Sequence, residues 1–171
     1  MFFQTFLGRQ HQAATGTSRP EYAAPTARHA TPPFLIVTDL DRRECTPILV
    51  REWLPEPKHP NLIFRVAVQE LESWILADRK GIAAFGGFAS SRIPPYTDAI
   101  PDPKRFLVRL FSRSRSPELR SRIVPSRNST AVVDPDYNAA LSDFVDDDWS
   151  VERACRSSES CRRAFRQLSK L

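Results

Sequence analysis

The chain contains little cysteine, histidine and glycine, and each shortage excludes a class of site. Its three cysteines among 171 residues lack metal-ligand spacing, which excludes a disulfide framework and a zinc site, so we expect Cys45, Cys155 and Cys161 to be free thiols. The three histidines lie in tail or proline-rich segments without a partner at ligand spacing. Of the five glycines, the adjacent pair Gly86 and Gly87 follows a predicted helix rather than a strand, so no phosphate-binding loop is indicated.

Long apolar runs are also missing. No run approaches the roughly 20 residues that a membrane span needs, and the opening segment MFFQTFLGRQ lacks the features of a cleaved signal peptide. We therefore expect a cytoplasmic protein without a membrane partner. The length of 171 residues, with 41% hydrophobic and 26% charged residues, is typical of one globular domain with a tail.

The net charge is +5, and arginine supplies most of the positive charge. The planar guanidinium group suits phosphate recognition. The same arginine bias also occurs in proteins from genomes rich in G and C, so composition alone favours a nucleic-acid partner only weakly.

Residues 1–33 are predicted to be a variable or disordered N-terminal tail. This segment is rich in Ala, Thr, Gln and Pro, contains Glu21 as its single acidic residue, and shows no sustained helical or strand period. We expect the folded domain to comprise residues 34–171.

The domain is predicted to open with a strand, a helix, a second strand and a second helix. Continuous apolar runs at 34–37 and 62–68 are typical of strands buried on both faces, and helical spacing follows each of them, at 43–54 and 69–83. This order implies a right-handed parallel crossover. The predicted fold class is therefore α/β, with a small parallel sheet flanked by helices.

The C-terminal part is predicted to be helical. Asp102 is expected to cap a helix over 103–111, and Asp134, before a proline, to begin another. Ser157 or Ser158 is expected to cap the last helix of the chain.

Four acidic side chains follow the two predicted strands. Asp39 and Asp41 end the first strand and face the same way, while Glu70 and Glu72 follow the second. The carboxyl ends of parallel strands meet at one edge of a sheet, where ligands usually bind. On an ideal helix Glu70 and Glu72 point about 200° apart, so only one of them is expected to face this edge.

Carboxylates gathered in this way repel one another unless a cation is present, and hard oxygen ligands select Mg²⁺ or Mn²⁺. Such an ion can activate a water and stabilise a phosphodiester under attack. A purely structural interpretation stays open, in which Asp39 and Asp41 end a strand and cap a helix, and Glu70 and Glu72 complement a helix dipole.

The segments FLIVTDLDRREC, RVAVQELESWILAD and IPDPKRFL, in this order, resemble a bacterial family, domain-of-unknown-function family 4276, which has a TOPRIM-like core. The likeness covers about residues 34–171. Its most specific part is the E-x-W-x-x-x-D run formed by Glu72, Trp74 and Asp78.

The resemblance implies a TOPRIM fold, the metal-binding core shared by topoisomerases, primases and some defence nucleases. Asp39 and Asp41 would then bind Mg²⁺, with Glu70 or Glu72 as a further, catalytic carboxylate. It also implies a metal-dependent nuclease or phosphodiester-processing effector in phage defence. The implied partners are nucleic acid, an ATPase and a further copy of the chain.

One feature of TOPRIM domains is missing. Residues 1–33 contain no glutamate in a stretch reading like V-E-G, since Glu21 lies in RPEYAAP. This departure favours a second hypothesis, a non-catalytic scaffold or partner subunit with a degenerate site.

Arg105, Arg109 and Arg113 are spaced i, i+4 and i+8 and are predicted to form one stripe that binds phosphate. Like charges at this spacing slightly disfavour a helix, and phosphate would relieve the repulsion. The alternative is a solvated face, because the segment lacks the platform of aromatic residues that base stacking of a single strand would need.

Overall fold

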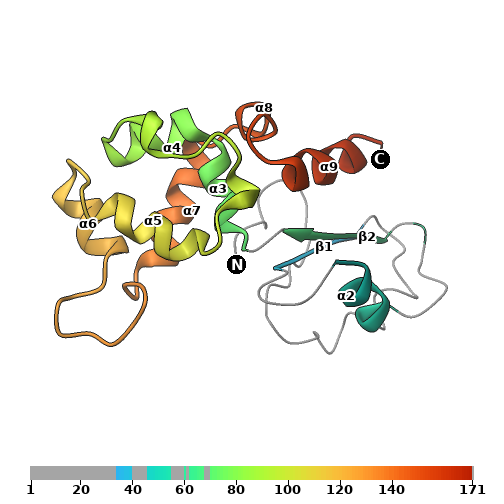
Figure 1. Cartoon of the computed structure of the whole chain (residues 1–171), viewed down its shortest axis with the longest axis horizontal. Helices are drawn as coiled ribbons and strands as arrows, with labels where there is room; N and C mark the ends of the chain where they lie inside the picture. The colour runs from blue at the N-terminus through green and yellow to red at the C-terminus, as the bar shows by residue number, and fades with distance from the viewer. Residues whose placement is uncertain (1–33, 40–45, 55–59, 61, 68–69, 171) are drawn as a thin grey trace.

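The computed structural model describes residues 34–39, 46–54, 60, 62–67 and 70–170. Within these residues the chain is α/β and mostly helical, with a small parallel sheet (Figure 1). The predicted tail 1–33, Asp41 and Cys45 lie outside the described residues. No described helix is long and apolar enough to cross a membrane.

The sheet consists of β1 (Phe34–Asp39) and β2 (Leu62–Ala67), and α2 (Thr46–Trp53) lies between them in the chain. The strands pair in parallel, with Asp39 opposite Ala67 at their carboxyl ends. Ile36 and Phe64 are buried, as the apolar runs predicted. Figure 1 shows α2 on one side of the strands and the C-terminal helix on the other.

The predicted second helix is divided in two. α3 (Glu72–Ala77) and α4 (Arg79–Gly86) meet at Asp78, whose backbone leaves the helical region at ψ 66°. The side chain of Asp78 restarts the helix by accepting a hydrogen bond from the N–H of Gly81 at 3.0 Å. Gly87, with φ 66°, ends α4 in the left-handed conformation.

Two short 3₁₀ turns, η1 (Ser90–Arg92) and η2 (Thr97–Ala99), lead to α5 (Pro103–Phe111) and α6 (Pro117–Ile123). The predicted start of α5 is confirmed, since Asp102 accepts a hydrogen bond from the N–H of Arg105 at 2.9 Å. Pro103 fits the first helical position because its missing N–H would have no partner there.

The last helices are α7 (Tyr137–Asp147), α8 (Val151–Ala154) and α9 (Glu159–Leu168). Ser158 caps α9, as one of the two predicted alternatives stated. The prediction that Asp134 caps α7 is wrong. Asp134 instead accepts the N–H of Asp136 at 3.0 Å, which forms a turn, and Asp136 occupies the N-cap position just before α7.

Two apolar clusters hold these elements together. The larger lies among α3 to α7 and includes the fully buried Leu107, Phe111 and Phe144. The smaller contains Trp74 and Cys161 and joins the strands to α3, α8 and α9. It fixes the helical part against the carboxyl ends of the strands, where the acidic residues lie.

Candidate functional site

Asp39 connects the end of β1 to the segment that follows β2. Its Oδ1 accepts a hydrogen bond from the backbone N–H of Leu71 at 2.7 Å. Leu71 is the residue immediately before α3. The two strand ends therefore meet as the parallel-sheet pattern predicted, and Asp39 lies beside the chain that carries Glu70 and Glu72.

Glu70 and Glu72 both contact Lys104, which lies in the first turn of α5. Glu70 Oε2 accepts the backbone N–H of Lys104 at 2.9 Å. The Lys104 ammonium lies 3.9 Å from Glu70 Oε1 and 3.5 Å from Glu72 Oε1. The expectation that only one glutamate faces this point is wrong, because α3 begins at Glu72 and helical angles do not apply to Glu70.

Glu72 is the more enclosed of the two glutamates, with 7% of its surface exposed. Its Oε1 accepts a hydrogen bond from the Tyr137 hydroxyl at 3.1 Å. Tyr137, at the start of α7, is buried. Glu72 is thus held in one orientation by a rigid donor from the helical core.

Burial and charge shift the protonation equilibria here. Burial raises the pKa of Glu70, and the nearby charges of Glu72 and Asp102 add to this effect, against the opposing influence of Lys104. Burial alone would lower the pKa of Lys104, but the charges of Glu72, Glu70 and Asp39 outweigh it, so the pKa of the ammonium is raised. Lys104 is therefore a firmly protonated cation.

Burial, followed by the charge of Glu72 and the hydrogen bond to it, raises the pKa of the Tyr137 hydroxyl above its ordinary range. Tyr137 consequently remains a hydrogen-bond donor throughout the physiological pH range. It is suited to orient Glu72 and unsuited to act as a base.

We define the carboxylate cluster as Asp39, Glu70, Glu72 and Lys104. When ionised, its three carboxylates exceed the single ammonium charge, which favours a further cation. All available ligands are carboxylate oxygens, the chemistry that Mg²⁺ prefers. Within the described residues no three acidic, histidine or cysteine side chains are placed so that they could hold a metal ion together. Mg²⁺ commonly uses only one or two carboxylates and keeps several waters, so the oxygen chemistry of the cluster suits it although the described side chains do not form a complete ligand set.

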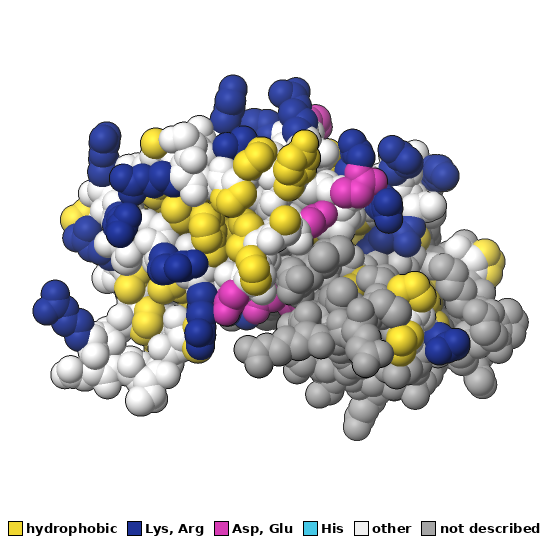
Figure 2. All heavy atoms as spheres, in the orientation of Figure 1, with side chains coloured by type: hydrophobic (Ala, Val, Ile, Leu, Met, Phe, Trp, Pro, Cys, Tyr) yellow, Lys and Arg dark blue, Asp and Glu magenta, His cyan; other side chains and the backbone are white. Residues whose placement is uncertain are grey.

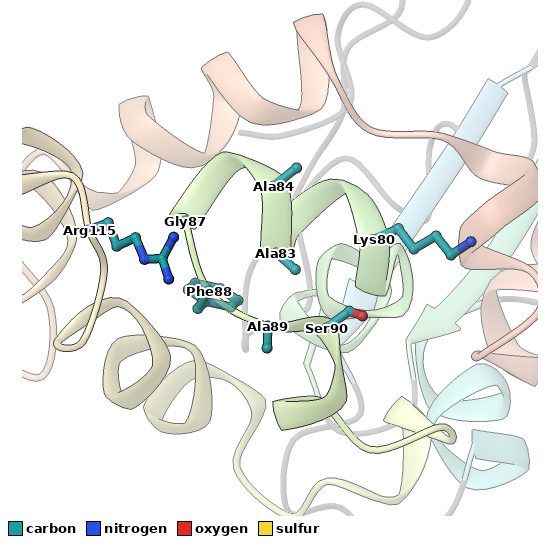
Figure 3. A pocket seen from close by; sticks show the side chains of 8 residues that line it. All are labelled: Lys80, Ala83, Ala84, Gly87, Phe88, Ala89, Ser90 and Arg115. Atoms are coloured by element: carbon teal, nitrogen blue, oxygen red, sulfur yellow. The ribbon is translucent and has the colours of Figure 1, made fainter.

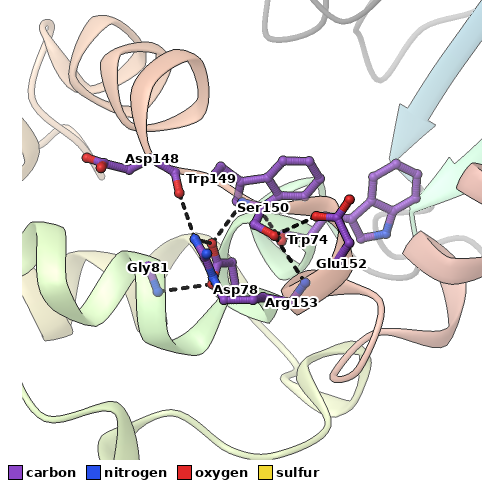
Figure 4. Close-up of polar contacts among 8 residues, drawn as sticks. All are labelled: Trp74, Asp78, Gly81, Asp148, Trp149, Ser150, Glu152 and Arg153. Carbon is purple, nitrogen blue, oxygen red and sulfur yellow. Dashed lines mark hydrogen bonds and ion pairs between the residues drawn. The ribbon is translucent and has the colours of Figure 1, made fainter.

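The residues of the E-x-W-x-x-x-D run have different roles: one belongs to the carboxylate cluster and the other two stabilise the packing of the helices. Glu72 belongs to the cluster, whereas Trp74 is core, as predicted, with Nε1 donating to Ser160 Oγ at 2.7 Å. The backbone carbonyl of Trp74 accepts Trp149 Nε1 at 3.1 Å. Asp78 is fully buried and pairs with Arg153 of α8 (Figure 4). Trp74 and Asp78 thus attach the C-terminal helices to α3.

The predicted arginine stripe is only partly formed. α5 ends at Phe111, so Arg113 lies in the following turn. Arg109 and Arg113 nevertheless line one surface hollow, which they share with Arg92 of η1. Arg105 lies outside this hollow and forms an ion pair with Asp102 at 3.5 Å.

A separate hollow lies over α4 (Figure 3). Figure 3 shows Arg115 beside Gly87 at one end and Lys80 at the other, with small side chains such as Ala83 between them. It carries no acidic side chain and contains none of the predicted site residues.

The sequence analysis missed Lys104, Tyr137 and Arg92. The sequence does contain a reason to single out Lys104. A lysine in the first turn of a helix opposes the helix dipole, so acidic partners are expected near it. Tyr137 and Arg92 have no such signal, since only the packing of distant segments brings them to the two sites.

Comparisons with known proteins identify no relative: no family model, curated protein or solved structure matches this chain.

Proposed function

We propose that the carboxylate cluster binds Mg²⁺ or Mn²⁺ and that the protein is a metal-dependent phosphodiesterase or nuclease with a TOPRIM-like core. The observation that supports this most is the hydrogen bond from the N–H of Leu71 to Asp39 Oδ1, which places Asp39 beside the segment that carries Glu70 and Glu72, at the carboxyl ends of two parallel strands. Such edges are where α/β sheets bind ligands. The resemblance to family 4276 suggests a cytoplasmic role in phage defence, beside an ATPase.

Each residue of the cluster has a distinct proposed task. Asp39 would hold the metal, together with Asp41, which lies outside the described residues. A metal bound there would activate a water and stabilise charge on the phosphate. Glu72, oriented by Tyr137, holds Lys104 in place, and the ammonium neutralises charge that develops on the phosphate.

Glu70 has the catalytic task in this proposal. Because burial raises its pKa, its carboxyl group takes up a proton more readily than an exposed glutamate does. It can therefore accept a proton at the edge of the site and release it again, the property required of a general acid or base.

A partner subunit without catalytic activity is the second candidate function. It is favoured by the hydrogen bonds and ion pairs that Lys104 and Tyr137 already give to Glu70 and Glu72. A satisfied polar network of this kind can stabilise a scaffold without any metal. The missing V-E-G glutamate points the same way.

Calorimetric titration with Mg²⁺ and Mn²⁺ distinguishes the two candidates. We expect wild-type protein to bind the ions, and Asp39→Asn and Glu70→Gln to weaken binding roughly tenfold or more, because each removes one negative charge at the site. Glu118→Gln, at an exposed acid on α6, is the matched control and should bind as wild type does.

A folded wild-type protein that binds neither ion would refute the metal site and favour the scaffold function. If the ions bind as expected, cleavage of single-stranded and duplex oligonucleotides should require the metal and be lost in Glu70→Gln.

A further inference from the structure

Two adjoining hollows lie along α5 and share Phe106 and Arg109. The arginine hollow, of about 460 Å³, is further lined by Arg92 and Arg113. The tyrosine hollow, of about 300 Å³, is further lined by Tyr96 together with Pro94 and Pro101. Each is as large as many ligand sites, and the two adjoin at Phe106 and Arg109; we call them together the groove.

We propose that this groove binds single-stranded nucleic acid, with phosphates in the arginine hollow and an unstacked base in the tyrosine hollow. The proposal specifies the substrate class of the function proposed above. It rests on that function only for the expectation that the bound strand is cleaved. Binding to the groove itself needs neither the metal nor the carboxylate cluster.

The arginine hollow has the charge that a phosphate requires. It gathers guanidinium groups from three places in the chain, η1, α5 and the turn after α5, and no acidic side chain lines it. Guanidinium groups bind phosphate oxygens through paired hydrogen bonds. Grouping three of them costs repulsion, which a bound polyanion removes.

Arg92 is carried by a turn that is fixed in place. The guanidinium of Arg79, on α4, donates hydrogen bonds to the carbonyl oxygens of Ile93 at 3.0 Å and Ser90 at 3.3 Å. These bonds hold both ends of η1. Arg92 therefore projects from a preorganised backbone, which reduces the entropy lost on binding.

The tyrosine hollow offers a surface for base stacking. Tyr96 is 72% exposed, which is unusual for a large aromatic side chain. Phe106 extends this apolar surface into the arginine hollow, with the Arg109 guanidinium 5.9 Å above its ring. Aromatic platforms beside basic grooves bind unstacked bases without strong sequence preference.

The fold supplies the aromatic platform that the arginine segment lacks by itself. Tyr96 precedes Arg109 in the chain and belongs to a different segment, and the fold brings the two together. Asp102 also lines the tyrosine hollow, but its carboxylate caps α5 and pairs with Arg105. Its charge is thus largely compensated.

The groove and the carboxylate cluster share one helix. Arg109 and Lys104 both lie on α5, about 7–8 Å apart along its axis at 1.5 Å per residue and about 140° apart around it, so the two sites face different sides of α5. Duplex nucleic acid keeps its bases stacked and paired, so it cannot use Tyr96 in this way.

The test is fluorescence anisotropy with a labelled oligo(dT) of about 12 nucleotides, a length within the usual site size, in EDTA and at several salt concentrations. Wild-type protein should bind this probe more tightly than a duplex of equal length. Tyr96→Ala should weaken single-strand binding roughly 5- to 100-fold. Arg109→Gln and Arg113→Gln should each reduce the salt slope by about 0.7.

Arg166→Gln, at an exposed arginine on α9, should leave binding unchanged. Equal binding of duplex and single strand, or a Tyr96→Ala protein that binds as wild type does, would overturn the proposal. So would absence of binding by a folded wild type. Because EDTA removes divalent ions, failure of the proposed metal site does not affect this result, and the two proposals are tested separately.

Discussion

Arg153 donates two hydrogen bonds to the carboxylate of Asp78, from Nε to Oδ1 at 2.6 Å and from Nη2 to Oδ2 at 2.7 Å. Asp78 is fully buried at the junction of α3 and α4, and its oxygens also accept the backbone N–H groups of Gly81 and Ser150 (Figure 4). The pair therefore joins α8 to the segment that carries Glu70 and Glu72.

Asp78→Ala should lower the free energy of unfolding by about 3–5 kcal/mol, because it leaves a guanidinium and two backbone donors without their buried acceptor. Urea unfolding followed by tryptophan fluorescence measures this loss. The control is Asp143→Ala, at an exposed acid paired with Arg122, where the loss should stay below about 1 kcal/mol. Equal losses in the two variants would contradict the assigned role of Asp78.

Lys104→Met should lower the free energy of unfolding by about 1–3 kcal/mol in EDTA, because Glu70 and Glu72 then lose their shared cation. Mg²⁺ should raise the melting temperature of this variant more than that of wild type, since the ion no longer competes with an ammonium. Thermal unfolding with and without Mg²⁺ tests both points. Lys80→Met, at an exposed lysine, should behave as wild type.

Glu70→Gln should change how stability depends on pH. Because burial raises the folded-state pKa of Glu70 above its ordinary value of 4.5, the folded protein binds this proton more tightly than the unfolded chain does. The associated stability is present below the ordinary pKa and is lost as pH rises through the raised one. The Glu70→Gln variant has no carboxyl group at this position, so its stability does not fall with rising pH for this reason.

The free energy of unfolding in EDTA, measured in urea from about pH 4 to about pH 8, a range that spans ordinary and raised glutamate pKa values, tests this linkage. The difference between Glu70→Gln and wild type should grow in favour of the variant as pH rises and then become constant. A difference independent of pH would show that the pKa of Glu70 is the same in the folded and unfolded states.

Gly87→Ala should lower the free energy of unfolding by about 1–2 kcal/mol, the usual cost of a left-handed conformation for a residue with a Cβ atom. That Cβ would also lie 3.1 Å from Cβ of Arg115 (Figure 3). Gly87→Asn should lose less, because asparagine tolerates positive φ better. Urea unfolding of the two variants measures the difference, and a neutral Gly87→Ala would contradict the strain.

Local patterns in the chain predicted most of the secondary structure. The apolar runs identified both strands, and Asp102 with Pro103 identified the start of α5, because short-range sterics and hydrogen bonding decide these features. The division at Asp78 was not predicted. The apolar stripe continues through it, and the break is made by partners that lie far along the chain, Ser150 and Arg153.

Figure 2 shows how the surface combines residues from distant segments: apolar side chains gather in the middle of this face, with lysine and arginine side chains around them. A sequence pattern samples residues at short separation, so it found Arg109 and Arg113 but neither Arg92 nor Tyr96. Packing of η1 and its neighbouring loop against α5 decides that these four lie along one groove.

The sequence by itself determined that acidic residues follow two parallel strands, since strand periodicity and chain direction alone place Asp39 and Glu70 at the same edge. Only the tertiary structure decided what these carboxylates meet. The packing of α5 against α3 brings Lys104 to Glu70 and Glu72, and the packing of α7 brings the Tyr137 hydroxyl to Glu72. Burial of apolar side chains that lie far apart in the chain drives the packing of both helices. Patterns of neighbouring residues do not predict which distant segments pack together.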